Sequence, residues 1–412
     1  MGYYIYLLFI VSWFTHLASR ITLLGFVRFD LVLVVLLFFI ALKEGFFNNL
    51  SNAKKTGSIL LVLSGYIAIT TPFVEWPGTV VRYGVENFIK AIVFFLFTVQ
   101  FVTTEWKLRV FLAVFLASMT FRVMEPLYLH ITEGYWGDVA FYSMGTEFMY
   151  RLSGAPHDII NPNGLAFVIL TILPFYYYLF FTSWKYKIAV LIMTPFLLYA
   201  LMLTGSRSGV IGLLIVVAGI VLKSQNKAMV IAIALICGIT MFSCLNPELR
   251  DRYLSIFSRE SKQAETASGR IEGVKESFRV AMRKPIVGHG LGTSIEANFN
   301  FTGKALRAHN LYAEIAQEIG FLGLIIFINY MRAIVSNFYE SYKRLKNRRY
   351  NCPFLFLVSE AMLLWMVMNF VFSFASYGLS SYEWYLFGGL SVVLLNLTAK
   401  LDAKESCRAH LS

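Results

Sequence analysis

Long apolar stretches separated by short polar segments dominate this chain of 412 residues. A helix that crosses a membrane needs about 20 mainly apolar residues. Twelve stretches approach that length and predict spans at residues 3–19, 29–42, 57–73, 86–104, 108–125, 161–181, 188–204, 209–222, 228–244, 309–330, 354–374 and 382–399. The second and eighth are short. The pattern predicts an all-α polytopic membrane protein.

Composition supports this prediction. Hydrophobic residues make up 58% of the chain and charged residues only 15%, whereas soluble domains carry about 25% charged residues. A soluble protein is therefore excluded. The four cysteines have no CxxC spacing, so they suggest neither a zinc cluster nor a disulfide framework.

The net charge of +12 would point to nucleic acid in a soluble protein. Here it reflects topology, because Lys and Arg in short loops are retained on the cytoplasmic side of a membrane. With the amino terminus inside, the inside segments hold half of the 36 Lys and Arg residues. Most of the remainder lie in one long outside loop. Both termini are predicted to be cytoplasmic, and the first span, which lacks a basic leader and an A-x-A site, to be a retained helix.

Two outside segments are long, at residues 126–160 and 245–308. In the second, apolar residues recur at helical spacing from Ile271 to Ala281, before Pro285. This pattern predicts an amphipathic helix, either lying on the membrane surface or capping the bundle. No internal repeat of the kind that marks many transporters is apparent.

Arg207 is the clearest candidate for chemistry. It lies in the sequence Thr204-Gly-Ser-Arg-Ser-Gly209, between two apolar spans. An ionisable group at the membrane is costly and is a functional candidate by default. A guanidinium offers a planar fork of donors that suits phosphate oxygens. The alternative is a tight turn with an arginine that reaches the membrane surface.

A second cluster precedes the tenth span. Gly288, Gly290 and Gly292 alternate with other residues and can let backbone amides approach an anion, although a flexible turn is the simpler interpretation. His289 is interpreted as a turn residue. His309 stands at a membrane boundary, where a neutral imidazole can accept a proton from a sugar hydroxyl, and a structural role is the alternative.

Glu318 follows in the same apolar span, about 13 Å deeper than His309. A carboxylate at such a depth needs a partner. Glu314 lies on the same helical face, and Lys90 or a backbone amide can compensate either acid. We favour a structural role for Glu318.

Four segments together resemble the O-antigen ligase and polymerase superfamily, membrane glycosyltransferases that handle undecaprenyl-diphosphate-linked glycans. They are Arg151-Leu-Ser-Gly with Asn161-Pro-Asn-Gly164, Thr204–Gly209, Ser268-Gly-Arg270 through Gly292, and His309-Asn-Leu-Tyr with Glu318–Gly323. The resemblance covers roughly residues 150 to 330. It divides the chain into amino-terminal helices at 1–150, a catalytic region at 151–330 that includes the 245–308 loop, and carboxy-terminal helices with a cytoplasmic tail at 331–412.

The resemblance also implies roles for individual residues. It makes Arg207 and Arg270 the diphosphate-binding arginines and His309 the residue that activates the acceptor. Further candidate substrate-binding residues are Arg151, Arg279, Gly290 and Asn310. It implies a metal-independent enzyme without a cofactor, and the chain has no D-x-D pair outside the membrane to hold a divalent ion.

The function expected on this basis is transfer of the lipid-linked glycan to a sugar acceptor at the periplasmic face of a bacterial inner membrane. A ligase uses lipid A core as the acceptor, and a polymerase uses another lipid-linked repeat unit. We slightly favour the ligase, because a single long basic loop leads to one histidine. Membrane lipid is an expected partner and nucleic acid is not. The alternative from another class is a twelve-helix transporter or lipid carrier.

Overall fold

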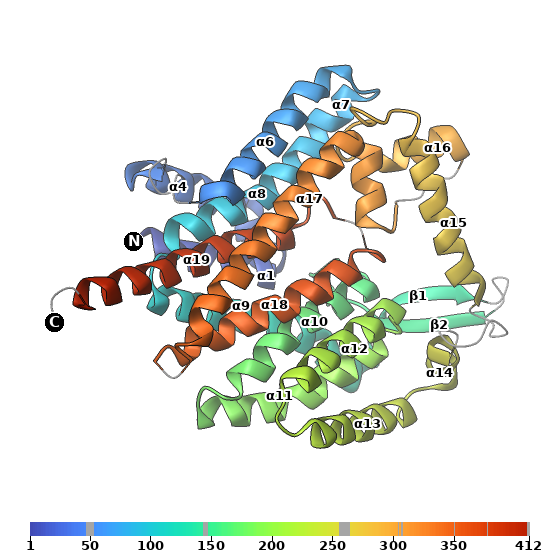
Figure 1. Cartoon of the computed structure of the whole chain (residues 1–412). Coiled ribbons are helices and arrows are strands. Elements are labelled where there is room, and N and C mark those ends of the chain that lie inside the picture. Colours follow the sequence, from blue (N-terminus) through green and yellow to red (C-terminus); the bar gives the residue numbers. More distant parts are fainter. Residues whose placement is uncertain are drawn as a thin grey trace.

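The computed structural model of the chain describes residues 1–46, 53–142, 147–254, 264–303, 305, 308–349, 351–376 and 378–409. Helices dominate it (Figure 1). The amino-terminal part contains α1 (Gly2–Thr15), α2 (Leu17–Arg20), α3 (Thr22–Phe26), α4 (Phe29–Lys43), α6 (Lys54–Thr70), η1 (Thr71–Phe73), α7 (Pro77–Thr79), η2 (Val80–Gly84), α8 (Val85–Phe101) and α9 (Glu105–Glu133). The central part contains β1 (Gly137–Tyr142), β2 (Glu147–Leu152), α10 (Pro162–Leu179), α11 (Trp184–Leu203), α12 (Arg207–Lys223) and α13 (Lys227–Ser243). The remainder contains α14 (Pro247–Leu254), α15 (Ala264–Ala281), α16 (Ser294–Thr302), α17 (Leu311–Lys346), α18 (Pro353–Phe372) and α19 (Tyr382–Ala409).

Eight helices of the described chain are long and apolar enough to cross a membrane. They are Lys55–Phe73, Pro77–Phe101, Glu105–Glu133, Pro162–Leu179, Trp184–Leu203, Leu311–Lys346, Pro353–Phe372 and Tyr382–Ala403, and each coincides with one of the twelve stretches expected from the sequence. The other four stretches form α1, α4, α12 and α13, which have 14, 15, 17 and 17 residues. A polytopic helical membrane protein is confirmed, while the count of twelve stays a prediction.

The two chain ends lie at the same end of the bundle. The Tyr3 hydroxyl donates a hydrogen bond to the carbonyl of Lys107 at 2.6 Å, and Lys400 Nζ lies 3.5 Å from the carbonyl of Thr103. Figure 1 shows both ends on the left and the hairpin, α14, α15 and α16 on the right. This arrangement is the one that cytoplasmic termini would require, and the compartment itself stays a prediction.

A β-hairpin corrects the all-α expectation. β1 and β2 pair antiparallel, with Gly137 opposite Leu152. Side chains on a strand point alternately to opposite faces. In β2, Met149 is buried while Phe148 and Tyr150 are exposed. Residues 126–160 were expected to be a long segment outside the spans, but their first part continues α9 as far as Glu133.

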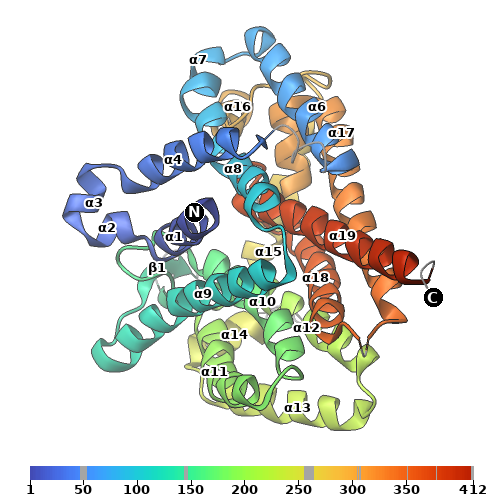
Figure 2. The same ribbon diagram turned by 90° about the vertical axis from the view of Figure 1, so that its left-hand side faces the viewer.

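Aromatic side chains fill the interior between helices. α19 packs against α8 and α17 (Figure 2). Trp365 of α18 stacks on Phe387 of α19, with an interplanar angle of 7°. Both side chains are fully buried. Stacked rings gain energy beyond the area they bury, so part of the high aromatic content serves helix packing.

The predicted amphipathic helix of the long connection is present as α15, and it contacts α17. Val280 and Ala281 are buried, whereas Ile271 is 62% exposed. Contact with α17 agrees with a helix that caps the bundle. Its position relative to the membrane surface stays a prediction.

Candidate functional site

A cavity of about 260 Å³ lies where five segments meet. The middle of α9, the start of α10, the residues just before and within the start of α17, the end of α18 with the following loop, and the start of α19 all contribute to it. Its polar wall includes Arg122, Asn161, Asn163, His309, Asn369, Ser373, Ser376, Ser381 and Glu383, and its aromatic wall includes Phe167, Phe372, Tyr382 and Trp384. We call this space the His309 cavity.

Three helices begin at the His309 cavity: α10, α17 and α19. The amino-terminal end of a helix carries a partial positive charge and free amide donors. At α10, Asn161 caps the helix by accepting a hydrogen bond from the Gly164 amide at 2.8 Å. Amide donors that the capping side chains leave unused can therefore bind polar groups of a ligand in the cavity.

His309 lies in the cavity wall and its side chain is exposed. The next residue fixes its position, because Asn310 caps α17. The Asn310 carboxamide oxygen accepts from the amides of Tyr312 and Ala313, both at 3.0 Å, and its nitrogen donates to the carbonyl of Phe374 at 3.1 Å. Substrate binding by Asn310, still a prediction, would have to replace these bonds.

Arg207 is buried at the first turn of α12. Ser206 caps that turn by accepting from the Gly209 amide at 3.1 Å. The sequence therefore folds the arginine motif into a capped helix start, which directs further amide donors towards the same region. Arg207 does not belong to the wall of the His309 cavity.

Two further arginines anchor the turn before Arg207. Arg151 of β2 donates from Nε to the Thr204 carbonyl at 2.8 Å and from Nη2 to Asn163 Oδ1 at 3.0 Å. Arg252 of α14 donates from Nε to the Gly205 carbonyl at 2.6 Å. Three of the four segments behind the family resemblance thus approach one another, since Asn163 lines the cavity that His309 also lines.

The backbone amides of the glycine-rich segment donate hydrogen bonds to other parts of the protein. The amide of Gly290 donates to the Glu318 carbonyl at 2.9 Å, and the amide of Gly292 donates to the Glu318 carboxylate at 2.7 Å. The Gly292 amide is therefore bound by the Glu318 side chain and the Gly290 amide by a backbone carbonyl, so both are occupied by the protein and not by a ligand. The predicted amide partner of Glu318 is confirmed, whereas Lys90 pairs instead with Glu86 at 2.6 Å.

Close backbone approach explains two glycines at this contact. Gly320 interrupts α17 with φ 73° and ψ 174°, and a Cβ there would lie 2.0 Å from the Ile286 carbonyl oxygen. Gly288 has φ 72°, and its Cβ would meet the Glu318 carbonyl oxygen at 2.4 Å. Only glycine fits both conditions without strain. The segment is a packed structural element and not the flexible turn that the sequence suggested.

His289 is fully buried within this packed segment. Its Nδ1 lies 2.7 Å from the Glu75 carboxylate and its Nε2 lies 3.0 Å from the Val280 carbonyl. Both ring nitrogens therefore have partners within the protein. The arrangement agrees with the interpretation of His289 as a structural residue.

The remaining predicted arginines lie on α15. Arg270 belongs to this helix, but its side chain lies outside the described residues. Arg279 is exposed, and its Nη1 lies 3.8 Å from Glu272 Oε1. Arg279 does not line the His309 cavity.

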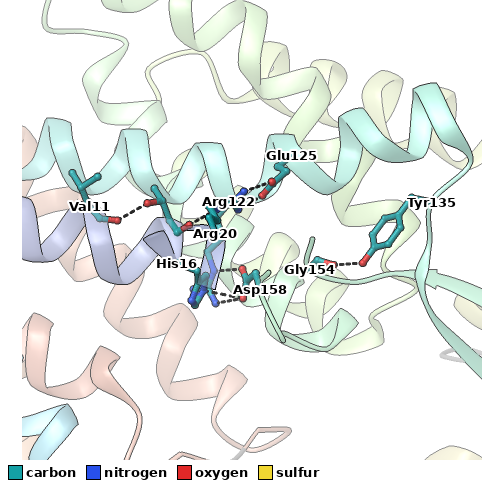
Figure 3. Close-up of polar contacts among 9 residues, drawn as sticks. Val11, His16, Arg20, Arg122, Glu125, Tyr135, Gly154 and Asp158 are labelled. Carbon is teal, nitrogen blue, oxygen red and sulfur yellow. Dashed lines mark hydrogen bonds and ion pairs between the residues drawn. The ribbon is translucent and has the colours of Figure 1, made fainter. Parts of the chain in front are cut away.

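A buried ion-pair cluster beside the cavity was missed at the level of sequence (Figure 3). Arg122 of α9 donates from Nη2 to Asp158 Oδ1 at 2.9 Å and from Nε to Oδ2, and His16 Nε2 lies 3.1 Å from Oδ1. Burial alone would raise the pKa of Asp158, but the hydrogen bonds from Arg122 and His16 outweigh it and lower that pKa to about 2. A signal existed, since Arg122 is an ionisable residue in an apolar span.

Acidic residues have two different roles around the cavity. The Glu314 carboxylate accepts from the amides of Gly378 and Leu379, at 2.7 and 3.1 Å, and so fastens the loop after α18 to α17. Glu383 lines the cavity itself and accepts a hydrogen bond from the Ser381 hydroxyl. Among the described residues, no group of three or more His, Cys, Asp or Glu side chains is placed to hold a metal ion.

Residues 188–328 match the family model described as O-antigen ligase. The resemblance to the O-antigen ligase and polymerase superfamily is thereby confirmed. The matched segment is about a third of the chain and includes Arg207, Arg270 and His309, while the cavity walls from α9, α10, α18 and α19 lie outside it. No curated protein sequence matches the chain.

Proposed function

Since this chain carries a domain of the O-antigen ligase family, we propose that it transfers a glycan from undecaprenyl diphosphate to a sugar acceptor. The family match supports a membrane glycosyltransferase of the ligase or polymerase type in general. The observation that carries the finer proposal is the position of His309, exposed in the wall of a polar cavity at the start of three helices.

The proposed reaction is a single displacement. The acceptor hydroxyl oxygen attacks the anomeric carbon of the donor, the bond from that carbon to the diphosphate oxygen breaks, and His309 takes the hydroxyl proton. Undecaprenyl diphosphate leaves with the bonding electron pair. A base positioned in this way typically contributes about 10² to 10⁴ in rate.

Arg207 and Arg270 are the proposed stabilisers of the leaving diphosphate. Charge grows on its oxygens in the transition state, where a preorganised guanidinium fork acts most strongly. The capped start of α12 supports this assignment for Arg207, because the helix end favours negative charge beside it. The arginines that anchor the preceding turn, Arg151 and Arg252, add positive charge to the same region.

Purified protein, lipid-linked glycan and a sugar acceptor test the proposal directly. A transferase forms a new glycosidic bond and releases undecaprenyl diphosphate. A transporter or lipid carrier of similar helix content would form no such bond. His309→Ala serves as the matched negative control, and product formation that is independent of His309 would move the base elsewhere.

Ligase-type transfer to lipid A core is the preferred form of the proposal. Its competitor is polymerase-type transfer to a second lipid-linked repeat unit. The two acceptors can be offered separately and then together to the same preparation. Elongated lipid-linked chains formed without lipid A core would establish the polymerase.

The cavity is proposed to face the periplasm, with both termini in the cytoplasm. The concentration of Lys and Arg in the short loops at the end that carries the termini supports this orientation. Lys275→Cys and Lys346→Cys, in a chain without native cysteines, can be labelled from outside in spheroplasts. Reaction at 346 but not at 275 would invert the topology.

A further inference from the structure

We propose that the His309 cavity is a binding site for one pyranose ring of the acceptor, with Asn369 and Glu383 as its hydroxyl-binding residues. The inference rests on the proposed glycosyl transfer and names the substrate group that enters the cavity. Neither residue lies in the segment that matches the family.

The size of the cavity suits a single ring. Its volume of about 260 Å³ is slightly below the range of roughly 300 to 1,000 Å³ that is common for small-molecule pockets. A diphosphate together with several sugars needs more room. One sugar with a few waters fits the space, and the rest of the glycan or lipid must extend outside.

Asn369 provides an unused donor at this place. It lies near the end of α18, it is 3% exposed, and it lines the cavity. Its side-chain nitrogen is buried and has no hydrogen-bond partner within the described chain. Buried amide groups nearly always have a partner, so a ligand hydroxyl or water in the cavity is the expected acceptor.

Glu383 provides an acceptor in the same cavity. The Ser381 hydroxyl donates to its Oε2. A carboxylate accepts several hydrogen bonds, so Glu383 can also accept a hydrogen bond from a sugar hydroxyl. A donor on α18 and an acceptor on α19 therefore line one space, which suits a ligand whose hydroxyl groups both donate and accept.

The charge of the wall argues against the diphosphate as the occupant. Arg122 is the wall's arginine, and Asp158 already binds it in a bidentate pair. The aromatic side chains, including Trp384 and Phe372, offer apolar surface to the C–H faces of a ring, as in other pockets with a few polar groups.

The occupant carries the attacking hydroxyl because His309 shares the wall. A ring held between Asn369 and Glu383 stays within the space that the proposed base borders. Arg207, the proposed diphosphate ligand, lies outside this wall. The cavity is therefore assigned to the acceptor and the arginine-rich turn to the donor.

Binding and kinetics test the assignment with Asn369→Ala and Glu383→Gln. The matched controls are Asn329→Ala, whose amide bonds within α17 at an exposed site, and Glu105→Gln, which forms an exposed pair with Arg109. We expect each cavity variant to raise the acceptor KM by about 10-fold and to leave the donor KM unchanged. Both controls should behave as wild type.

The probes for direct binding are the methyl pyranosides of glucose, galactose and N-acetylglucosamine, followed by tryptophan fluorescence through Trp384, with Trp384→Phe as the signal control. At least one should bind, compete with the acceptor, and bind less tightly to both cavity variants. Binding should survive His309→Ala, which separates this proposal from the proposed chemistry. Failure of all three probes, or a raised donor KM in place of the acceptor KM, would overturn the assignment.

Discussion

Two histidines twenty residues apart, His289 and His309, occupy opposite kinds of surroundings in one protein. His289 is fully buried, and both ring nitrogens face protein acceptors. His309 is exposed in the wall of a cavity. Their sequence positions already differ, because His289 lies between two glycines whereas His309 stands at the start of an apolar span.

The acids repeat the contrast. Glu318 is bound by the amide of Gly292 where the glycine segment packs against the break in α17, whereas Glu383 faces an open space. A region whose polar groups mainly bind other groups of the protein serves the fold. A region whose polar groups face a cavity can bind a ligand. The following variants test that division.

The largest effect is expected for His309→Ala. Loss of a positioned base should lower kcat by about 10² to 10⁴ while the affinity for lipid-linked donor is retained. Turnover and donor binding are to be measured on the same purified protein. If donor affinity falls in proportion to rate, His309 is a binding residue and not the base. The contrast between a structural His289 and a catalytic His309 would then be wrong.

Arg207→Lys should follow, with a fall in turnover of roughly 10². Lysine keeps the positive charge but cannot form the bidentate fork. Arg270→Ala should also lose most activity, and both variants should insert and accumulate normally. Arg109→Lys, at an exposed pair with Glu105, is the control. Wild-type turnover by Arg207→Lys would return that residue to a structural role.

Gly320→Ala tests the packed contact between the glycine-rich segment and α17. Position 320 has a positive φ, and a Cβ there would meet the Ile286 carbonyl. The substitution should therefore cost about 1 to 3 kcal/mol of stability. Thermal unfolding in detergent measures the loss, and the folded fraction should keep its specific turnover. Gly65→Ala on α6, where a Cβ meets nothing within 4 Å, is the control. An unchanged melting temperature for Gly320→Ala would show that the packed segment tolerates strain.

The span pattern was readable from sequence because lipid imposes a length and an apolar composition on each helix. All eight long apolar helices coincide with expected stretches. The β-hairpin was not predicted, because β1 and β2 are only six residues each and both mix apolar with polar residues. Whether such short segments form strands depends on how their side chains pack and are buried in the fold, which a single sequence does not display.

The candidate site was readable in part. His309 and Arg207 stand out as polar residues beside apolar spans. The pair between Arg122 and Asp158 joins residues 36 positions apart, and the cavity joins Asn369 and Glu383 to His309 from different helices. Such contacts depend on how the helices pack against one another. Neither residue spacing nor composition predicts them.

Asp158→Asn tests the ion pair that holds Arg122 in the cavity wall. The pKa of Asp158 is lowered from 3.8 to about 2, so its charged form stabilises the fold by about 2 kcal/mol at neutral pH. That contribution is present above the unfolded pKa and is lost as pH falls from about 4 through about 2. The gap in unfolding free energy between wild type and Asp158→Asn should therefore be constant from pH 7 to 5 and narrow below pH 4.

The control is Asp402→Asn. Asp402 pairs with Arg344 and Arg348, and its side chain is 39% exposed, so the substitution should cost less than about 1 kcal/mol. Equal losses for the two variants would show that Asp158 holds the cavity wall no more firmly than a surface pair does.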